Sequence, residues 1–241
     1  MIQWTYGQLR TRVINELDLE NETFIGPDEM VGFCNEALAR AEAEIHKINE
    51  DYFLTNAPLS LVLNQQVYSL PSDIYAKKIR KIVYQSGAII YEVRRIRGEK
   101  EFFDATVTDY FGAGLYWRYR YILINRSAAV GDQIQLHPVP TTENGPLFTI
   151  WYLRGILQIP LVSAGSQAAS DATLIDIPEF YNYIIQYMKC KVLEKEGDPR
   201  LQNAMAVLAN VQQNMVDTLT QMVPDDDDTI VPDFSHYWEH E

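Results

Sequence analysis

Apolar side chains recur at helical spacing in two segments near the N-terminus. In the first, Thr5 and Gln8 form the capping-box pattern that opens a helix, and the apolar spacing extends this helix to about Leu19. Gly26-Pro27 then interrupts the chain. A second helix follows, and its single apolar face is formed by Met30, Cys34, Ala37, Leu38, Ala41, Ile45 and Ile48. This pattern predicts two antiparallel helices joined by a short loop.

The same helical period returns near the C-terminus. Pro178 and Glu179 lie at the start of a helix, and Gly197 followed by Pro199 marks its end. A last helix is predicted from Pro199 to about Met222. Its heptad seam, with one polar member, consists of Leu201, Met205, Leu208, Gln212, Met215, Leu219 and Met222. Because each helix has one apolar face to bury, we expect the two pairs to pack together in one antiparallel bundle.

Between the helix pairs, the chain has short runs rich in β-branched and aromatic residues. Two of them, at 79–84 and 89–93, flank Ser86-Gly87, which is typical of a hairpin turn. Further strands are expected at 116–125, 134–136 and 147–153, and one or two helical turns at 99–105. The sequence therefore predicts an α+β protein. Its domains are a helical bundle of residues 1–50 and 174–223, an inserted β-rich domain at 51–173 and an extended C-terminal tail at 224–241.

Charge is distributed unevenly along the 241 residues, whose formal net charge is −13. From residue 75 to 126 there are eleven Lys and Arg against five Asp and Glu, interleaved with aromatic residues. Such a pattern fits a nucleic-acid surface, or a β surface whose arginines pair with acids of neighbouring subunits. The candidate contact residues are Lys77, Lys78, Arg80, Lys81, Arg94, Arg95, Arg97, Arg118 and Arg120.

The C-terminal segment from 224 to 241 has the opposite character, with seven acidic residues and no Lys or Arg. It also carries apolar side chains, which a purely solvating tail lacks. This mixture favours docking into a partner groove, and the alternative is a solvated end. The candidate partner-binding residues are Asp225, Asp226, Asp227, Asp228, Ile230, Phe234, Tyr237 and Trp238.

The sequence contains no motif that indicates catalysis, so we expect no enzymatic activity. Its four histidines lack metalloprotease spacing, and the pair Cys34 and Cys190 forms neither a disulfide framework nor a metal-ligand pattern. The Gly112-Ala113-Gly114 stretch is followed by neither the third glycine nor the Lys-Ser/Thr pair of a phosphate-binding loop. We therefore predict no catalytic residue, no metal site and no cofactor. No signal peptide or membrane-spanning run is expected either, which predicts a protein that is made and kept in the cytoplasm, at least until assembly.

Several short motifs resemble the head-to-tail adaptor, or connector, proteins of tailed bacteriophages, in particular the tail tubular A-like adaptors of short-tailed phages. The resemblance extends to about residue 220 and rests on loose patterns. They are Trp4-Thr5-Tyr6-Gly7-Gln8-Leu9, Phe33-Cys34-Asn35-Glu36-Ala37, Leu63-Asn64-Gln65-Gln66-Val67-Tyr68-Ser69-Leu70-Pro71, Gln135-Leu136-His137-Pro138-Val139-Pro140, Phe148-Thr149-Ile150-Trp151-Tyr152, Asp176-Ile177-Pro178-Glu179 and Glu194-Lys195-Glu196-Gly197-Asp198-Pro199.

This resemblance implies a structural virion protein at the head–tail junction. It implies a homo-oligomeric ring of twelve copies beneath the portal, a C-terminal tail that binds the portal protein, contact with a downstream tail or nozzle protein, and genomic DNA passing through the channel. Three alternatives stay open from the residues. They are another tail component, such as a tail-tip or fibre-attachment protein, a nucleic-acid-binding module that uses the basic β region, and an enzyme of unknown class.

Overall fold

The structure is a computed structural model that describes residues 3–19, 24–96, 119–127, 131–141 and 144–222. The chain forms two compact units. The first comprises the described residues of Met1–Tyr52 and Ile156–Glu241, and the second comprises those of Phe53–Gly155. The second unit is therefore inserted between two segments of the first.

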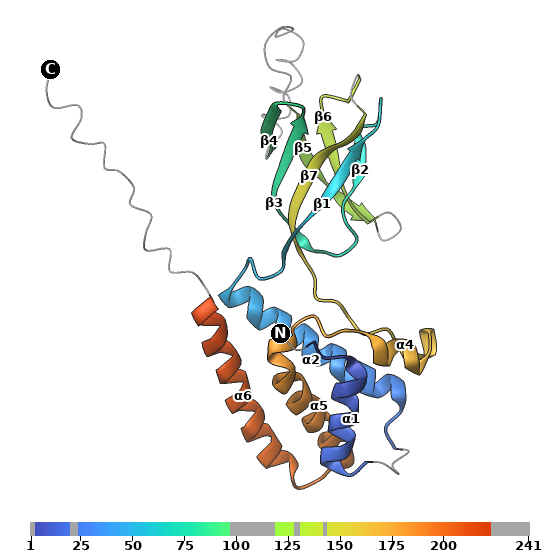
Figure 1. Cartoon of the computed structure of the whole chain (residues 1–241), viewed down its shortest axis with the longest axis vertical. Coiled ribbons are helices and arrows are strands. Elements are labelled where there is room, and N and C mark those ends of the chain that lie inside the picture. Colours follow the sequence, from blue (N-terminus) through green and yellow to red (C-terminus); the bar gives the residue numbers. More distant parts are fainter. Residues whose placement is uncertain (1–2, 20–23, 97–118, 128–130, 142–143, 223–241) are drawn as a thin grey trace, which may run out of the picture. The chain divides into compact units, whose positions relative to one another are not determined.

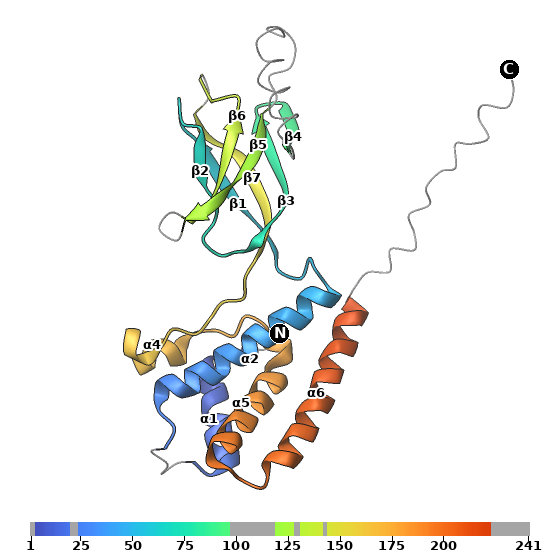
Figure 2. The ribbon, with the colours of Figure 1, turned by 180° about the vertical axis from the view of Figure 1, so that it is seen from behind.

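The first unit is helical. Its elements are α1 (Tyr6–Leu17), α2 (Pro27–Ile48), η1 (Val162–Ala164), α4 (Gln167–Ala172), η2 (Pro178–Phe180), α5 (Tyr181–Glu196) and α6 (Leu201–Met222). Helix α5 packs against α1, α2 and α6, and it lies between α1 and α6 in both ribbon views (Figures 1 and 2). This position explains why its residues from Tyr183 to Met188 are all buried, including the polar Gln186.

Polar contacts connect α5 to each of its neighbours. Lys189 Nζ lies 2.8 Å from a Glu16 carboxylate oxygen on α1, and Gln186 donates to the Ala204 carbonyl of α6 at 2.8 Å. On the α2 side, the Tyr187 hydroxyl donates to Glu36 at 2.5 Å. Because the amide of Gln186 is buried, its bond to Ala204 satisfies a donor that would otherwise destabilise the fold.

The second unit is a curled sheet of seven strands. These are β1 (Leu54–Leu61), β2 (Val67–Ser69), β3 (Ile74–Ser86), β4 (Ile89–Arg95), β5 (Arg120–Ser127), β6 (Gly131–His137) and β7 (Gly145–Arg154). Their order across the sheet is β1-β7-β3-β4-β5-β6-β2, and all neighbours are antiparallel except the β4–β5 pair. The two edge strands, β1 and β2, follow each other in sequence, so the turn between them connects opposite edges of the curl (Figure 1).

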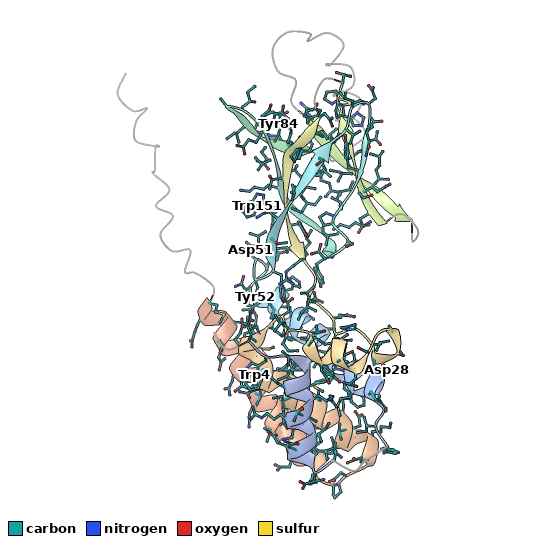
Figure 3. The ribbon with its side chains drawn as sticks, turned by 45° about the vertical axis from the view of Figure 1, so that its right-hand side comes forward. Trp4, Asp28, Asp51, Tyr52, Tyr84 and Trp151 are labelled. Atoms are coloured by element: carbon teal, nitrogen blue, oxygen red, sulfur yellow. The ribbon has the colours of Figure 1, made fainter. Side chains whose placement is uncertain are left out.

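The concave side of this sheet holds the core of the second unit. Ile82, Ile134 and Phe148 are fully buried there, and Tyr84 stacks on Tyr91 at 4.8 Å between ring centroids (Figure 3). Near the sheet edges, the Tyr68 hydroxyl accepts from the backbone N–H of Val62 and donates to the Gln65 carbonyl. One side chain thus fixes the connection that links the two edges.

The α+β class predicted from the sequence is confirmed, and the helix periods correspond to α1, α2, α5 and α6. The predicted hairpin is β3–β4, with Ser86 paired to Ile89. Residues 156–173 group with the helices and include α4, whereas the sequence assigns them to the β-rich domain. The expected turns at 99–105 and the tail at 224–241 lie outside the described residues. The roles assigned to the helical bundle, the β-rich domain and the C-terminal tail stay predictions.

Among the described residues, no helix has the length and apolar character needed to cross a membrane.

Candidate functional site

The clearest candidate site is a basic cleft in the second unit, at the point where β4 changes partners. Strand β4 pairs with β3 only opposite Ile82–Ser86, and then pairs with β5 through Arg94 and Arg95. The preceding part of β3, from Lys77 to Lys81, borders the cleft that opens beside this change of partners. The cleft therefore lies where β4 no longer pairs with β3 and pairs with β5 instead.

The cleft has a volume of about 430 Å³ and a strongly basic lining. Among the described residues that line it, the cations are Lys77, Arg80, Lys81, Arg94 and Arg95, and the one acidic residue is Glu92. Ile79, Val93, Tyr121 and Leu123 supply the apolar part of the lining. Five cations around one concave surface favour an anionic ligand, because arginine presents several N–H donors to carboxylates or phosphates.

A backbone irregularity in β3 positions the first of these cations. Ala76 and Lys77 adopt φ values of 46° and 58°, and the pairing of β3 with β7 shifts register between Ile74 and Ile79. Two consecutive left-handed residues other than glycine are strained, and such bulges commonly redirect a side chain. Here Lys77 Nζ lies 3.3 Å from the carboxylate of Asp132, on β6.

The second lysine of the cleft is held in a different way. Lys81 Nζ lies 5.1 Å from the centroid of the Trp151 ring, on the neighbouring strand β7. A cation over the face of an indole is attracted by the electron-rich ring, typically by about 0.5–1 kcal/mol at exposed sites. Both lysines of the cleft thus have partners that restrict where their ammonium groups lie.

The arginines on β4 differ from the lysines. Arg94 and Arg95 are exposed, and neither guanidinium forms an ion pair with another residue in the part of the chain that the structure describes. Arg94 is also the register partner of Arg120 on β5, so two cations occupy matching positions on neighbouring strands. Like charges at such positions repel. A bound anion would remove this repulsion.

The structure brings five of the nine basic residues predicted from the sequence into this one cleft. Lys78 lies elsewhere, 5.7 Å from the Tyr75 ring, and Arg120 is exposed on β5. Arg97 and Arg118 lie outside the described residues, as do all eight predicted positions of the C-terminal segment. Sequence reasoning missed Glu92 and Asp132. No local signal marks them, because their roles depend on which strands are neighbours.

A second surface lies on α6, in the first unit. Only Ala204, Met215 and Leu219 of this 22-residue helix are buried, and Met205, Val207 and Met222 are exposed. Asp217 is the only charged residue within its bounds. A groove of about 280 Å³ beside α6 is lined by residues of α1, η2, α5 and α6, among them Arg12, Phe180 and Met215. A half-apolar helix surface with a single charged residue is typical of a contact with another protein.

The two cysteines lie in apolar surroundings. Burial raises the pKa of the Cys34 thiol to about 12 and also raises the pKa of the Cys190 thiol. Both thiols are therefore protonated near neutral pH, and both cysteines are buried. Within the described residues, no group of three or more His, Cys, Asp or Glu side chains is arranged to hold a metal ion.

Comparison with known proteins identifies the family of the chain. Residues 4–232 match the family model described as SU10 adaptor protein, so the match includes both units and most of the chain. No curated protein matches the chain. The match supports the predicted phage adaptor, whereas the finer resemblance to tail tubular A-like proteins of short-tailed phages stays a prediction. The chain belongs to the SU10 adaptor protein family and is a structural adaptor component of a bacteriophage virion.

Proposed function

We propose that the protein is the head-to-tail adaptor of its phage, forming a ring beneath the portal protein and connecting the portal to the tail. The match of residues 4–232 to an adaptor family carries this proposal. Adaptor membership implies association with portal and tail proteins. In this proposal twelve copies surround a channel for the genomic DNA, and the protein acts without catalysis, metal or cofactor.

The helical unit is the ring-forming part in this proposal. Helices α1, α2, α5 and α6 form its antiparallel bundle, and the exposed side chains of α6 supply a surface for the next copy. Met205 is 53% exposed and Val207 is 41% exposed, although both are apolar. Burying such side chains against another subunit is favourable, by about 25 cal/mol for each Å² of apolar surface. The nearly uncharged helix adds little desolvation cost to such a contact.

The C-terminal segment supplies the portal contact in this proposal. Its candidate portal-binding residues are Asp225, Asp226, Asp227, Asp228, Ile230, Phe234, Tyr237 and Trp238. Aromatic side chains in a short segment are common anchors in protein interfaces, and neighbouring acids steer association with a positively charged partner. The basic residues of the second unit are assigned to contacts with a downstream tail or nozzle protein.

The test compares the full-length chain with a chain that ends at Val223, each mixed with the portal protein of the same phage. Light scattering gives the mass of the complexes, and electron microscopy gives their symmetry. We expect rings on the portal with the full-length chain and loss of portal binding with the shortened chain. If the full-length chain does not bind the portal, the proposed function is wrong.

The cleft also favours a second candidate, binding of nucleic acid, because five cations line one surface. Contacts with phosphates make DNA affinity fall steeply as the salt concentration rises. The formal net charge of −13 opposes such binding. A salt titration of binding to a DNA duplex tests this candidate, and affinity that does not depend on salt excludes a phosphate contact.

A further inference from the structure

We propose that the basic cleft of the second unit is an intramolecular docking site for the chain's own acidic C-terminal segment, Pro224–Glu241. This inference does not depend on the proposed function, because it concerns the free protein. Two properties of the chain carry it. They are the excess of cations in the cleft and the complementary charge of the segment that follows α6.

The charges of the two parts are opposite in sign. The described residues that line the cleft include five cations and one carboxylate. The guanidinium groups of Arg94 and Arg95 form no ion pair with the described residues, and Arg94 lies beside Arg120. The segment has seven acidic residues and no lysine or arginine. Carboxylates near Arg94 would both form charge-assisted hydrogen bonds and reduce the repulsion between the arginines.

The size of the cleft favours a peptide over a DNA duplex. Its volume of about 430 Å³ lies within the ~300–1,000 Å³ typical of pockets that enclose small ligands, and a few carboxylate side chains fit such a space. A duplex presents its phosphates along a wide helix and binds through charges spread over a surface.

Covalent connection makes this occupant stronger than a free peptide of the same sequence. A tethered segment binds at an effective concentration that reaches the millimolar range for short flexible connections. The eighteen residues from Pro224 to Glu241 span as much as ~60 Å when extended. Individual exposed ion pairs are weak, at about 0–1 kcal/mol, so the contact is reversible and sensitive to salt.

A consequence follows if the proposed function also holds. The residues assigned to portal binding and those that occupy the cleft belong to the same segment, so the two contacts compete. In the free protein the segment would be held on the second unit, and the portal would have to displace it. Premature capture of the segment by other basic partners would then be reduced until a portal is present.

The test uses carbodiimide coupling of the full-length protein at low salt, followed by mass spectrometry. The carbodiimide activates a carboxylate, a lysine amine attacks the activated carbon to form an amide, and the reagent leaves as a urea that has taken up the elements of water. The cleft offers two amines, Lys77 and Lys81. We expect links in monomeric protein from acids of 224–241 to these lysines, and their loss at high salt.

The variant Arg94→Glu tests the cleft directly, and Lys78→Glu is its matched control. Both substitutions change one charge on the second unit by the same amount, but Lys78 does not line the cleft. We expect Arg94→Glu to lower the yield of these links about fivefold, as expected for the loss of a favourable ion pair, and Lys78→Glu to leave it unchanged. The link between Lys77 and Asp132, which lie 3.3 Å apart, serves as an internal control for folding and reactivity.

Three outcomes would overturn the inference. One is the absence of links from the segment to Lys77 and Lys81 while the Lys77–Asp132 link forms. Another is an equal yield in wild type and Arg94→Glu, and the third is links found only between different copies of the chain. If these links are absent and Arg94→Glu weakens binding of a DNA duplex, the cleft is a nucleic-acid contact. Portal binding is measured separately, so failure of this inference leaves the proposed function intact.

Discussion

Single residues at the ends of the helices determine where α1 and α5 begin and stop. The hydroxyl of Thr5 accepts from the Gln8 backbone N–H, and the Gln8 side chain accepts from the Thr5 N–H, so both donors at the start of α1 are satisfied. Gly197 ends α5 in the left-handed conformation, with φ of 67°. The turn between α5 and α6 therefore depends on a residue without a side chain.

Replacing Gly197 tests this dependence. Gly197→Ala puts a Cβ on a left-handed residue, and we expect the free energy of unfolding to fall by about 1 kcal/mol. Gly32→Ala is the matched control, because Gly32 lies within α2 and a Cβ there meets no atom within 4 Å. Since alanine favours a helix interior, the control should gain about 0.5–1 kcal/mol. Urea unfolding gives the free energy of unfolding of both variants. Equal changes in the two variants would contradict the role of the left-handed conformation at Gly197.

The contact between Glu36 and Tyr187 predicts a pH dependence. The hydrogen bond from the Tyr187 hydroxyl lowers the pKa of Glu36, with smaller contributions from Lys191 and Arg40. A folded-state pKa below the unfolded value of about 4.3 contributes stability that is present above pH 4.3 and is lost as the pH falls through the folded value. Glu36→Gln should therefore lose less stability than wild type between pH 6 and pH 3.

The measurement is the free energy of unfolding in urea at each pH. Glu196→Gln is the control, since Glu196 is exposed at the end of α5 and accepts no hydrogen bond from the residues that the structure describes. We expect the free energy of unfolding of this variant to depend on pH as it does in wild type. The free energy of unfolding of Glu36→Gln should still fall as the pH is lowered, because Glu16 and Asp198 also have lowered pKa values. A wild-type slope in Glu36→Gln would contradict the role of the Tyr187 contact.

At the scale of elements, the helices, several strands and the β3–β4 hairpin were predictable, whereas the order of the strands in the sheet was not. Thr5 and Gln8, Pro27 and Gly197 are local signals, and each lies where its helix starts or stops. The order of the strands depends on contacts between distant segments, which no local pattern reports. The parallel pairing of Arg94 with Arg120 is one example. The basic residues could therefore be named from the sequence, but the cleft that gathers five of them could not.

Helix α6 gives a prediction at this scale, because its heptad seam is buried only in part. Leu219 is fully buried, whereas Met205 is 53% exposed, although both belong to the seam predicted from the sequence. We expect Leu219→Ala to lower the free energy of unfolding of the isolated chain by about 2–5 kcal/mol. Met205→Ala should change it by about 0.5 kcal/mol or less. Chemical denaturation of the two variants measures this contrast, and a large loss in Met205→Ala would show that the helix packs differently.

The whole molecule consists of two units, each with buried residues of its own. Ile134 belongs to the core of the second unit, and Ile184 is fully buried in the first. A chain of this kind need not unfold in one step, because each core can be lost separately. Stability measured as one number for the molecule would then combine two independent transitions.

A reciprocal pair of substitutions tests this independence. Ile134→Ala should destabilise the second unit by about 2–5 kcal/mol, and Ile184→Ala should do the same to the first. Native-state hydrogen exchange, read by mass spectrometry, reports the protection of each unit separately. We expect each variant to lose protection in its own unit and to keep it in the other. Equal losses in both units would mean that they unfold together.

The pairing of β1 with β7 bears on the order in which the chain folds. Leu54 and Leu153 are register partners, and the Arg154 N–H donates to the Phe53 carbonyl at 3.2 Å, so the first and last residues of the second unit lie side by side. The helical unit is interrupted by roughly a hundred residues, and closing such a loop costs about 4 kcal/mol of chain entropy. Once the inserted sheet has formed, that loop is already closed. During synthesis α1 and α2 emerge first, before α5, against which they pack, has been made. The sheet then folds and brings its first and last residues together. The segment that contains α5 and α6 therefore starts close to the end of α2.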